Sequence, residues 1–321
     1  MSSPFGFLQY LRLKLVVSLM RFANYFVRNG RHYRPSPSCV RKPVRIPSRD
    51  LRRFIDAWVY YPPGSGSQDG SSPDLPPMPL VVNWHGSAMI LPNLGMDHAF
   101  CERLAREAGV LVLDADYRKA PEDPFPAAVE DVEDALRWVA GQPRLFDPDR
   151  VAFSGFSAGA NLALVASSQL LPPPSEGNGK ALNVRAVYAF YPGVDFTIPP
   201  ETKTTIASPI APLPIFAQHL FYDCYAPRHP DRSDPRMSPL RADPSTFASA
   251  KVMLFPCSGD VLGPETVAFG EKLRAAGCDA ETDVVSDAAH GFDKTIKART
   301  HNAPETERTY AKVVRSLKEV M

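Results

Sequence analysis

Along most of the chain, short apolar runs alternate with longer stretches in which apolar residues recur with helical spacing. The runs LVVNW at 80–84 and KVMLF at 251–255 are almost entirely apolar, which is typical of strands that helices cover on both faces. This pattern predicts strands at 54–60, 80–84, 110–114, 150–154, 184–190, 251–255 and 281–285. It predicts helices at 98–107, 127–140, 160–170, 265–276 and 305–320. We therefore expect an α/β fold with a mostly parallel central sheet between two layers of helices.

One long interval breaks this alternation. About 60 residues separate the strand that ends near residue 191 from the strand at 251–255, far more than an ordinary connection needs. An apolar, helical segment at 210–225 lies within it. We expect this insertion to form a cap over the sheet, with a surface excursion packed on the core as the alternative. The Pro/Gly/Ser-rich loops at 62–79 and 172–180 are too short to be domain linkers, so one domain is expected.

The segment at 5–27 is apolar but carries basic residues. A spanning helix needs about 20 residues with few charges, and a secretory signal has its positive charge before the apolar run, so neither description fits. On a helical wheel one face holds Leu8, Leu15, Leu19, Phe22 and Phe26, and another holds Lys14, Arg21 and Arg28. We predict an amphipathic helix docked on its own domain. Peripheral contact with a membrane surface is the alternative.

Composition narrows the classes of partner. The 321 residues are 44% hydrophobic, and 36 Lys and Arg balance 35 Asp and Glu, so no basic field that would attract nucleic acid is expected. The five cysteines are an odd number without CxxC spacing, which argues against a disulfide framework and a zinc site. We expect buried, reduced thiols in a cytoplasmic protein, and a small, nearly neutral substrate.

The stretch VAFSGFSAGANLAL at 151–164 places a serine between two glycines. Gly155, Ser157 and Gly159 match G-x-S-x-G, the tight strand-to-helix turn that exposes a serine hydroxyl at the edge of the sheet. The pattern alone is common, but an apolar strand precedes it here and a helical pattern follows. Ser157 is therefore the candidate nucleophile.

A serine hydroxyl needs a base held by a carboxylate, and in this kind of fold the chain order is serine, acid, histidine. Only His290, in SDAAHGFD, follows the last predicted strand directly. Asp260, in SGDVLG, follows the strand at 251–255. The other histidines precede the serine, fall in the insertion or open the last helix: His32, His85, His98, His219, His229 and His301. Asp260 and His290 are therefore the candidate acid and base.

A negative charge develops on the carbonyl oxygen that the serine attacks, and hydrogen-bond donors must stabilise it. In this kind of fold, backbone NH groups of the loop after an earlier central strand are among these donors. The strand LVVNW is followed by His85, Gly86, Ser87 and Ala88. We expect the backbone of this loop to face the nucleophile and the Ala158 NH to be the remaining donor. The side chain of His85 is expected to shape the loop.

Five motifs together resemble the hormone-sensitive-lipase-like family of α/β-hydrolase carboxylesterases. They are HGSA at 85–88, DADYRKAPEDPFPAAVED at 114–131, GFSAG at 155–159, GD at 259–260 and HGF at 290–292. The resemblance runs from about residue 78 to the C-terminus. It implies the α/β-hydrolase fold, the triad Ser157, Asp260 and His290, and an oxyanion hole formed by the NH groups of Ser87, Ala88 and Ala158.

The resemblance also implies how the chain is divided. Residues 1–45 would form an N-terminal helical cap segment, 196–239 the cap insertion, and 46–195 with 240–321 the hydrolase core. No metal or organic cofactor is expected.

The chain departs from the family pattern at two motifs. The usual His-Gly-Gly-Gly loop has Ser87 and Ala88 in place of its last two glycines, which should narrow the oxyanion hole and restrict the backbone. The turn around the serine usually carries an acidic residue where this chain has Phe156, and a glycine where it has Ala160. We expect these changes to tune activity without abolishing it.

The expected reaction is hydrolysis of a small to medium apolar or aromatic ester through an acyl-enzyme. One alternative is an enzyme of secondary metabolism that cleaves a lactone or amide or catalyses a non-hydrolytic step. The other is a small-molecule receptor on the same fold. Plant gibberellin receptors resemble this family but lack the catalytic histidine, and the presence of His290 weighs against that interpretation. No oligomeric state is predicted.

Overall fold

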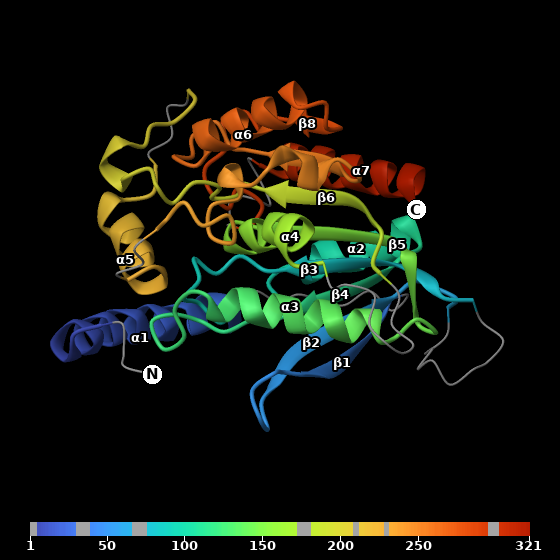
Figure 1. Cartoon of the computed structure of the whole chain (residues 1–321), viewed down its shortest axis with the longest axis horizontal. Coiled ribbons are helices and arrows are strands. Elements are labelled where there is room, and N and C mark those ends of the chain that lie inside the picture. The colour runs from blue at the N-terminus through green and yellow to red at the C-terminus, as the bar shows by residue number, and fades with distance from the viewer. Residues whose placement is uncertain are drawn as a thin grey trace.

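The computed structural model describes residues 5–29, 39–65, 76–171, 181–207, 212–227, 231–294 and 302–321, and these form one α/β architecture (Figure 1). An eight-stranded sheet has the order β1-β2-β4-β3-β5-β6-β7-β8. Its strands are β1 Val40–Pro47, β2 Phe54–Tyr61, β3 Met78–Trp84, β4 Leu111–Ala115, β5 Phe146–Phe156, β6 Val184–Phe190, β7 Lys251–Phe255 and β8 Ala280–Thr282. β1, β2 and β4 pair antiparallel, and all other pairs are parallel. The predicted mostly parallel sheet is confirmed.

Helices cover both faces of this sheet, as predicted. The helices are α1 Phe7–Asn29, α2 His98–Ala108, α3 Ala127–Ala140, α4 Ala158–Gln169, α5 Ile215–Tyr225, α6 Gly263–Ala275 and α7 Ala303–Val320. Short 3₁₀ helices lie at Pro200–Thr202 (η1), Pro239–Arg241 (η2) and Pro244–Phe247 (η3). Side chains of α3, α4 and α6 pack on one face of the sheet, and side chains of α2 and α7 pack on the other. Alternate residues of β3 enter these two cores, Val82 one and Val81 the other, which explains why the strand is apolar at successive positions.

The sequence pattern missed one strand and overestimated another. β1 has the sequence VRKPVRIP and pairs along its whole length with β2, so the sheet begins near residue 40 and not at the expected core boundary of 46. Its Arg, Lys and Pro residues are typical of an edge strand, which hides the apolar alternation on which the prediction depended. The predicted strand at 281–285 is short, because β8 ends at Thr282 and Val285 forms only an isolated bridge with Cys257.

Helix α1 packs on its own domain, but not through the predicted apolar face. Leu13 and Val17 are buried, whereas the face that holds Leu8, Leu15 and Phe22 is exposed to solvent. None of the described helices is long and apolar enough to cross a membrane.

The insertion between β6 and β7 contributes α5, which lies beside α1 at one end of the molecule (Figure 1). The two helices share a hydrophobic cluster in which Leu13 and Val17 of α1 lie with Leu220 and Cys224 of α5. The loop predicted at 172–180, most of the loop at 62–79, and His32, His229 and His301 lie outside the described residues.

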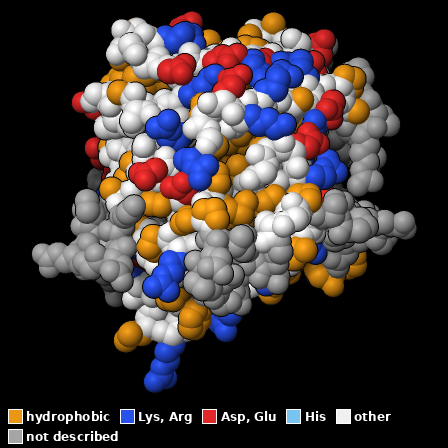
Figure 2. Space-filling view, turned by 90° about the vertical axis from the view of Figure 1, so that its right-hand side faces the viewer, with side chains coloured by type: hydrophobic (Ala, Val, Ile, Leu, Met, Phe, Trp, Pro, Cys, Tyr) orange, Lys and Arg blue, Asp and Glu red, His pale blue; other side chains and the backbone are white. Residues whose placement is uncertain are grey.

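All five cysteines are buried and free of disulfide bonds, as the spacing predicted. On the face that Figure 2 shows, basic and acidic side chains are interspersed across the upper part of the surface. This mixture agrees with the near equality of Lys and Arg with Asp and Glu in the sequence.

Candidate active site

Ser157 lies on the tight turn between β5 and α4, with φ of 53° and ψ of −116°. A non-glycine residue at positive φ is uncommon and strained. Steric crowding on both sides explains the flanking glycines. A Cβ on Gly155 would lie 2.3 Å from the carbonyl oxygen of Gly159, and a Cβ on Gly159 would lie 1.9 Å from the carbonyl oxygen of Trp84. The turn can therefore form only with glycine at both positions.

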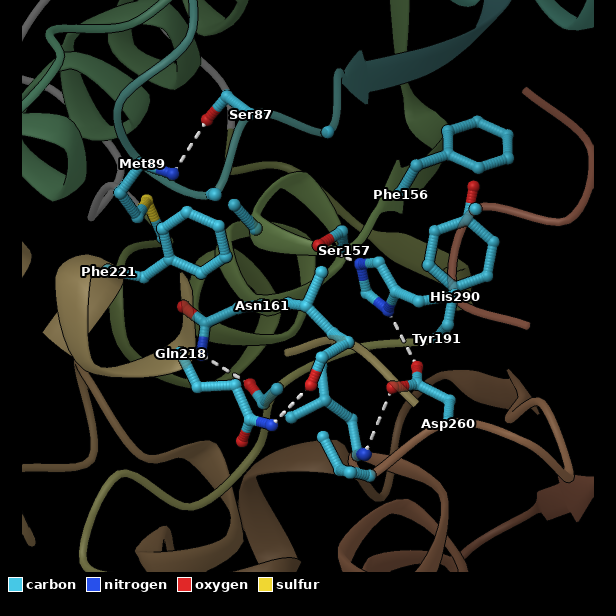
Figure 3. A pocket seen from close by; sticks show the side chains of 18 of the residues that line it. Ser87, Met89, Phe156, Ser157, Asn161, Tyr191, Gln218, Phe221, Asp260 and His290 are labelled. Atoms are coloured by element: carbon cyan, nitrogen blue, oxygen red, sulfur yellow. Dashed lines mark hydrogen bonds and ion pairs between the residues drawn. The ribbon is translucent and has the colours of Figure 1, made fainter. Parts of the chain in front are cut away.

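The structure brings the candidate nucleophile, base and acid into one hydrogen-bonded chain (Figure 3). Nε2 of His290 lies 2.8 Å from Oγ of Ser157, and Nδ1 of His290 lies 2.6 Å from Oδ2 of Asp260. The other carboxylate oxygen of Asp260 accepts a 3.2 Å hydrogen bond from the Leu262 NH. Asp260 is buried, and His290 is partly exposed on the cavity side. The three residues come from the ends of three different strands, as the sequence order required.

The charged groups around His290 favour the protonated form of its imidazole. Burial lowers the pKa of His290, but the adjacent Asp260 carboxylate and the more distant Asp293 together outweigh this effect. The net pKa of His290 is above its ordinary value. An imidazole held in this way can accept the serine proton and remain stabilised as the imidazolium.

Two residues that the sequence analysis did not single out support the base. The Tyr191 ring packs edge-on against the His290 ring, with centroids 4.9 Å apart, and its hydroxyl donates a 2.6 Å hydrogen bond to Asp293. Asp293 lies three residues after His290, directly behind the HGF motif. The sequence offered only that proximity as a signal, and it did not indicate a contact with Tyr191.

The turn before the serine contains Phe156 where the family usually has an acid. The Lys294 ammonium lies 3.5 Å from the centroid of the Phe156 ring. It also forms ion pairs of 2.8 Å with Asp97 and with Asp293. Lys294 is thus paired with two carboxylates, and the Phe156 ring adds a cation–π contact at the position where the family usually has an acid.

The candidate oxyanion donors lie where the motifs predicted. Ala158 is the first residue of α4, and the first NH groups of a helix have no acceptor within it. The loop at 85–88 follows β3 and passes so close to the nucleophile that a Cβ on Gly86 would lie 3.5 Å from Cβ of Ser157. Ala88 and Met89 have φ of 50° and 61°, so the residue that replaces a family glycine does adopt a backbone conformation that favours glycine.

Side chains from the long 114–131 motif hold this loop. The Tyr117 hydroxyl donates a 2.7 Å hydrogen bond to the His85 carbonyl and lies 2.6 Å from Oγ of Ser87. Oγ of Ser87 in turn accepts a hydrogen bond from the Met89 NH. The Ser87 side chain is therefore engaged with the loop itself and with Tyr117. The sequence analysis used the motif only as a signature and missed this role.

His85 fits its expected role in shaping the loop. Nε2 of His85 lies 2.9 Å from Oδ1 of Asp116, and its ring stacks on Tyr117 with centroids 4.9 Å apart. Asn93 donates a 2.9 Å hydrogen bond to the Gly86 carbonyl from the other side. These contacts fix the backbone on which the oxyanion donors would lie.

A cavity of about 280 Å³ lies in front of Ser157, between the sheet and the cap. The cap contributes apolar and aromatic lining residues: Phe196, Leu213, Phe221, Tyr222 and Tyr225. The polar lining includes an ion pair between Lys203 and Glu265, both of which are buried. Among the described residues, no group of three or more His, Cys, Asp or Glu could hold a metal ion.

Comparisons with known proteins agree with this architecture. Residues 81–294 match the model of a family described as having the alpha/beta hydrolase fold. An AB hydrolase superfamily protein of Schizosaccharomyces pombe is 28% identical over 83% of this chain and 78% of its own length. The carboxylic ester hydrolase LipN of Mycobacterium tuberculosis is 32% identical over 74% of this chain and 61% of its own length. The solved structure of a hyperthermophilic esterase from Pyrobaculum calidifontis is 25% identical, with a TM-score of 0.74 over 96% of this chain and 91% of that one.

Proposed function

The chain belongs to the α/β-hydrolase-fold family as an enzyme of its carboxylesterase branch, and we propose that it hydrolyses small to medium apolar or aromatic esters through Ser157, His290 and Asp260. The family membership confirms the resemblance to hormone-sensitive-lipase-like carboxylesterases. The observation that carries the proposal is the hydrogen-bonded chain from Ser157 through His290 to Asp260 at the edge of an apolar cavity.

In the first step, Nε2 of His290 removes the proton of Ser157 while Oγ attacks the ester carbonyl carbon. The NH groups of Ser87, Ala88 and Ala158 stabilise the negative charge on the carbonyl oxygen. The imidazolium then donates its proton to the departing alcohol, which leaves an acyl group on Ser157. In the second step, His290 removes a proton from water, which attacks the carbonyl carbon of the acyl-enzyme. The imidazolium then returns this proton to Oγ of Ser157 as the bond to the acyl carbon breaks and the acid leaves.

The size and lining of the cavity support the choice of substrate. Its volume of about 280 Å³ is near the lower end of the roughly 300–1,000 Å³ that is usual for ligand sites. The aromatic cap residues favour apolar or aromatic acyl and alcohol groups of modest length. We therefore expect faster hydrolysis of p-nitrophenyl butyrate than of p-nitrophenyl palmitate.

The test is hydrolysis of p-nitrophenyl acetate and butyrate by the wild type and by Ser157→Ala. We expect the variant to lose at least about a thousandfold in kcat, because removing a triad member abolishes covalent catalysis. Ser168→Ala is the matched control, because Ser168 lies on α4, the helix that follows Ser157, and its hydroxyl donates a hydrogen bond to the Leu164 carbonyl. Full turnover by Ser157→Ala would refute the proposed nucleophile.

A fluorophosphonate probe provides a second readout, because it forms a covalent adduct only with an activated serine. Mass spectrometry should map the adduct to the peptide that contains Ser157. An adduct without ester turnover, together with activity on lactones or aryl formamides, would favour a hydrolase with a different substrate class. Tight binding of a small molecule with neither adduct nor turnover would favour a receptor.

A further inference from the structure

The outward face of α1 is apolar along the length of the helix. Its five central side chains are between 59% and 79% exposed: Leu8, Leu15, Leu19, Phe22 and Phe26. They recur at intervals of three, four and seven residues, so they form one continuous stripe. A helix on the surface of a soluble domain normally has the reverse arrangement, with charged or polar side chains outward.

This exposure is not explained by an undocked helix. The opposite side of α1 is fixed to the domain, because Leu13 and Val17 are buried and Arg21 donates hydrogen bonds to the Ile90 and Ala120 carbonyls. Arg21 also forms an ion pair with Glu122. The 100° rotation between successive residues places these docking contacts and the apolar stripe on opposite sides of the helix.

The cap also carries exposed apolar side chains. α1 and α5 share a hydrophobic cluster, and α5 begins with two further exposed side chains, Ile215 and Phe216. Figure 1 shows the two helices side by side at the same end of the molecule. A continuous exposed apolar stripe such as that on α1 marks a site of interaction with a protein or a membrane.

The charges on α1 identify the partner. The helix contains Arg12, Lys14, Arg21 and Arg28 and has no acidic residue. Arg12 is exposed directly beside the apolar stripe. Lys14 is also exposed, but it lies between the stripe and the docked side, 3.9 Å from Glu122. A basic helix with Leu and Phe on its apolar face is the pattern that binds in the plane of an anionic lipid surface.

We propose that the outward face of α1 is a docking site for an anionic membrane surface. The apolar stripe enters the boundary between headgroups and acyl chains, and the exposed Arg12 and Lys14 side chains contact the anionic headgroups. The helix lies in the plane of the membrane and does not cross it. This docking does not depend on the proposed esterase function, because none of the residues that line the cavity belongs to α1.

The test is co-sedimentation of the full-length protein with vesicles of phosphatidylcholine, and with vesicles of equimolar phosphatidylcholine and phosphatidylserine. We expect binding to the anionic vesicles that weakens as salt is added. Leu15→Ser/Leu19→Ser/Phe22→Ser should lower the partition coefficient at least about 100-fold, because three large apolar side chains are removed from the buried face. Arg12→Gln/Lys14→Gln should lower it at least about tenfold on anionic vesicles.

Leu51→Ser is the matched control, because Leu51 is 96% exposed in the turn between β1 and β2, outside the proposed face. It should bind vesicles like the wild type. Hydrolysis of p-nitrophenyl butyrate should be unchanged in all of these variants, which reports folding separately from docking. If the triple variant is unfolded, Phe22→Trp offers a second measurement, and its fluorescence should shift to the blue with anionic vesicles.

Several results would overturn the proposal. One is that the wild type binds the anionic vesicles no more strongly than it binds vesicles of phosphatidylcholine alone. Another is that the triple variant binds the anionic vesicles as strongly as the wild type. A third is a wild-type dimer in light scattering that the triple variant does not form, because the face would then be an interface between two copies. An unshifted Phe22→Trp spectrum on anionic vesicles would also refute it.

Discussion

The ion pair between Lys203 and Glu265 lies in the wall of the cavity, and breaking it should test how the cap is held on the core. Lys203 directly follows the 3₁₀ helix η1 of the cap insertion, and Glu265 lies in the first turn of α6. Their side chains are only 3% and 2% exposed. The other carboxylate oxygen of Glu265 accepts hydrogen bonds of 2.8 Å and 3.3 Å from the NH groups of Val194 and Asp195. The test replaces Lys203 alone, Glu265 alone, and both residues together.

The expected magnitude follows from these contacts. Removing one partner of a buried pair costs about 3–5 kcal/mol of unfolding free energy, because the other charge stays buried without compensation. In Lys203→Met, Glu265 keeps two amide donors, so we expect a loss of about 3 kcal/mol. In Glu265→Gln, Lys203 loses its carboxylate partner, and the loss should be about as large. Lys203→Met/Glu265→Gln leaves no buried charge and should be within about 1 kcal/mol of the wild type.

The loss in Lys203→Met should also depend on pH. Burial raises the pKa of Glu265 above its ordinary value, and the Lys203 ammonium opposes that increase. Without the lysine, the pKa of Glu265 in the folded state should rise further. A carboxyl group whose pKa is raised by folding stabilises the fold fully only below its unfolded pKa, and that stability is lost as the pH rises through the folded pKa. The deficit of Lys203→Met relative to the wild type should therefore shrink between pH 7 and pH 5.

The assay is urea unfolding of the four proteins, followed by intrinsic fluorescence at pH 7 and pH 5. Lys251→Met is the matched control, because Lys251 pairs with the mostly exposed Glu319 at 3.8 Å and should change stability by less than about 1 kcal/mol. A loss below about 1 kcal/mol in both single variants would refute the reasoning, as would a double variant that loses as much as the two single variants combined.

Three further variants test the site and the core. Gly159→Ala should lower the free energy of unfolding by at least about 3 kcal/mol, measured with urea, because its Cβ would lie 1.9 Å from the carbonyl oxygen of Trp84 in β3. Gly193→Ala is the control, because its Cβ would meet only ordinary contacts at 3.8 Å or more. The raised pKa of His290 predicts that kcat/KM increases with pH through a midpoint above 6.5. Asp260→Asn should lower this midpoint, and it should lower kcat about 10³–10⁴-fold. Burial and a neighbouring carboxylate raise the pKa of Asp114 to about 8. The free energy of unfolding of the wild type should therefore fall between pH 4 and pH 8, by up to about 1.4 kcal/mol per pH unit. Asp114→Asn should remove this fall.

Each of these expectations has a clear contradiction. Wild-type stability in Gly159→Ala would mean that the turn tolerates a Cβ and that the steric argument is wrong. A pH–rate profile that Asp260→Asn does not shift would separate Asp260 from the titration of His290. Stability curves of the wild type and of Asp114→Asn that stay parallel from pH 4 to pH 8 would show that Asp114 ionises normally.

The three members of the candidate triad could be selected from the sequence because chain order and strand position fix them. Ser157, Asp260 and His290 each follow a strand, and ends of parallel strands meet at one edge of a sheet. Their convergence within hydrogen-bonding distance in the structure therefore required only the correct assignment of strands. The same reasoning placed Ala158 just before the helix predicted at 160–170. In the structure Ala158 is the first residue of α4, where its NH has no intrahelical acceptor.

The supporting contacts could not be predicted in the same way. Tyr117 reaches the HGSA loop across about 30 residues of sequence, and Tyr191 meets Asp293 across about 100, so neither contact leaves a local pattern. The positive φ of Ala88 has no signal in its residue type, because alanine disfavours that conformation. Strand β1 was missed because an edge strand needs little apolar character when its partner supplies the buried face.

Helix α1 shows where hydrophobic periodicity stops being informative. The stripe from Leu8 to Phe26 is real, but periodicity reports only that apolar side chains share a face and not what that face contacts. The domain is instead contacted by the face of Leu13 and Val17, with Arg21 bonded to backbone carbonyls beside the candidate oxyanion loop. A charged residue thus serves the intramolecular contact, while the longest apolar stripe is left outward. That inversion favours a second apolar partner for α1, and it places that partner on the side of the helix opposite the active-site loop.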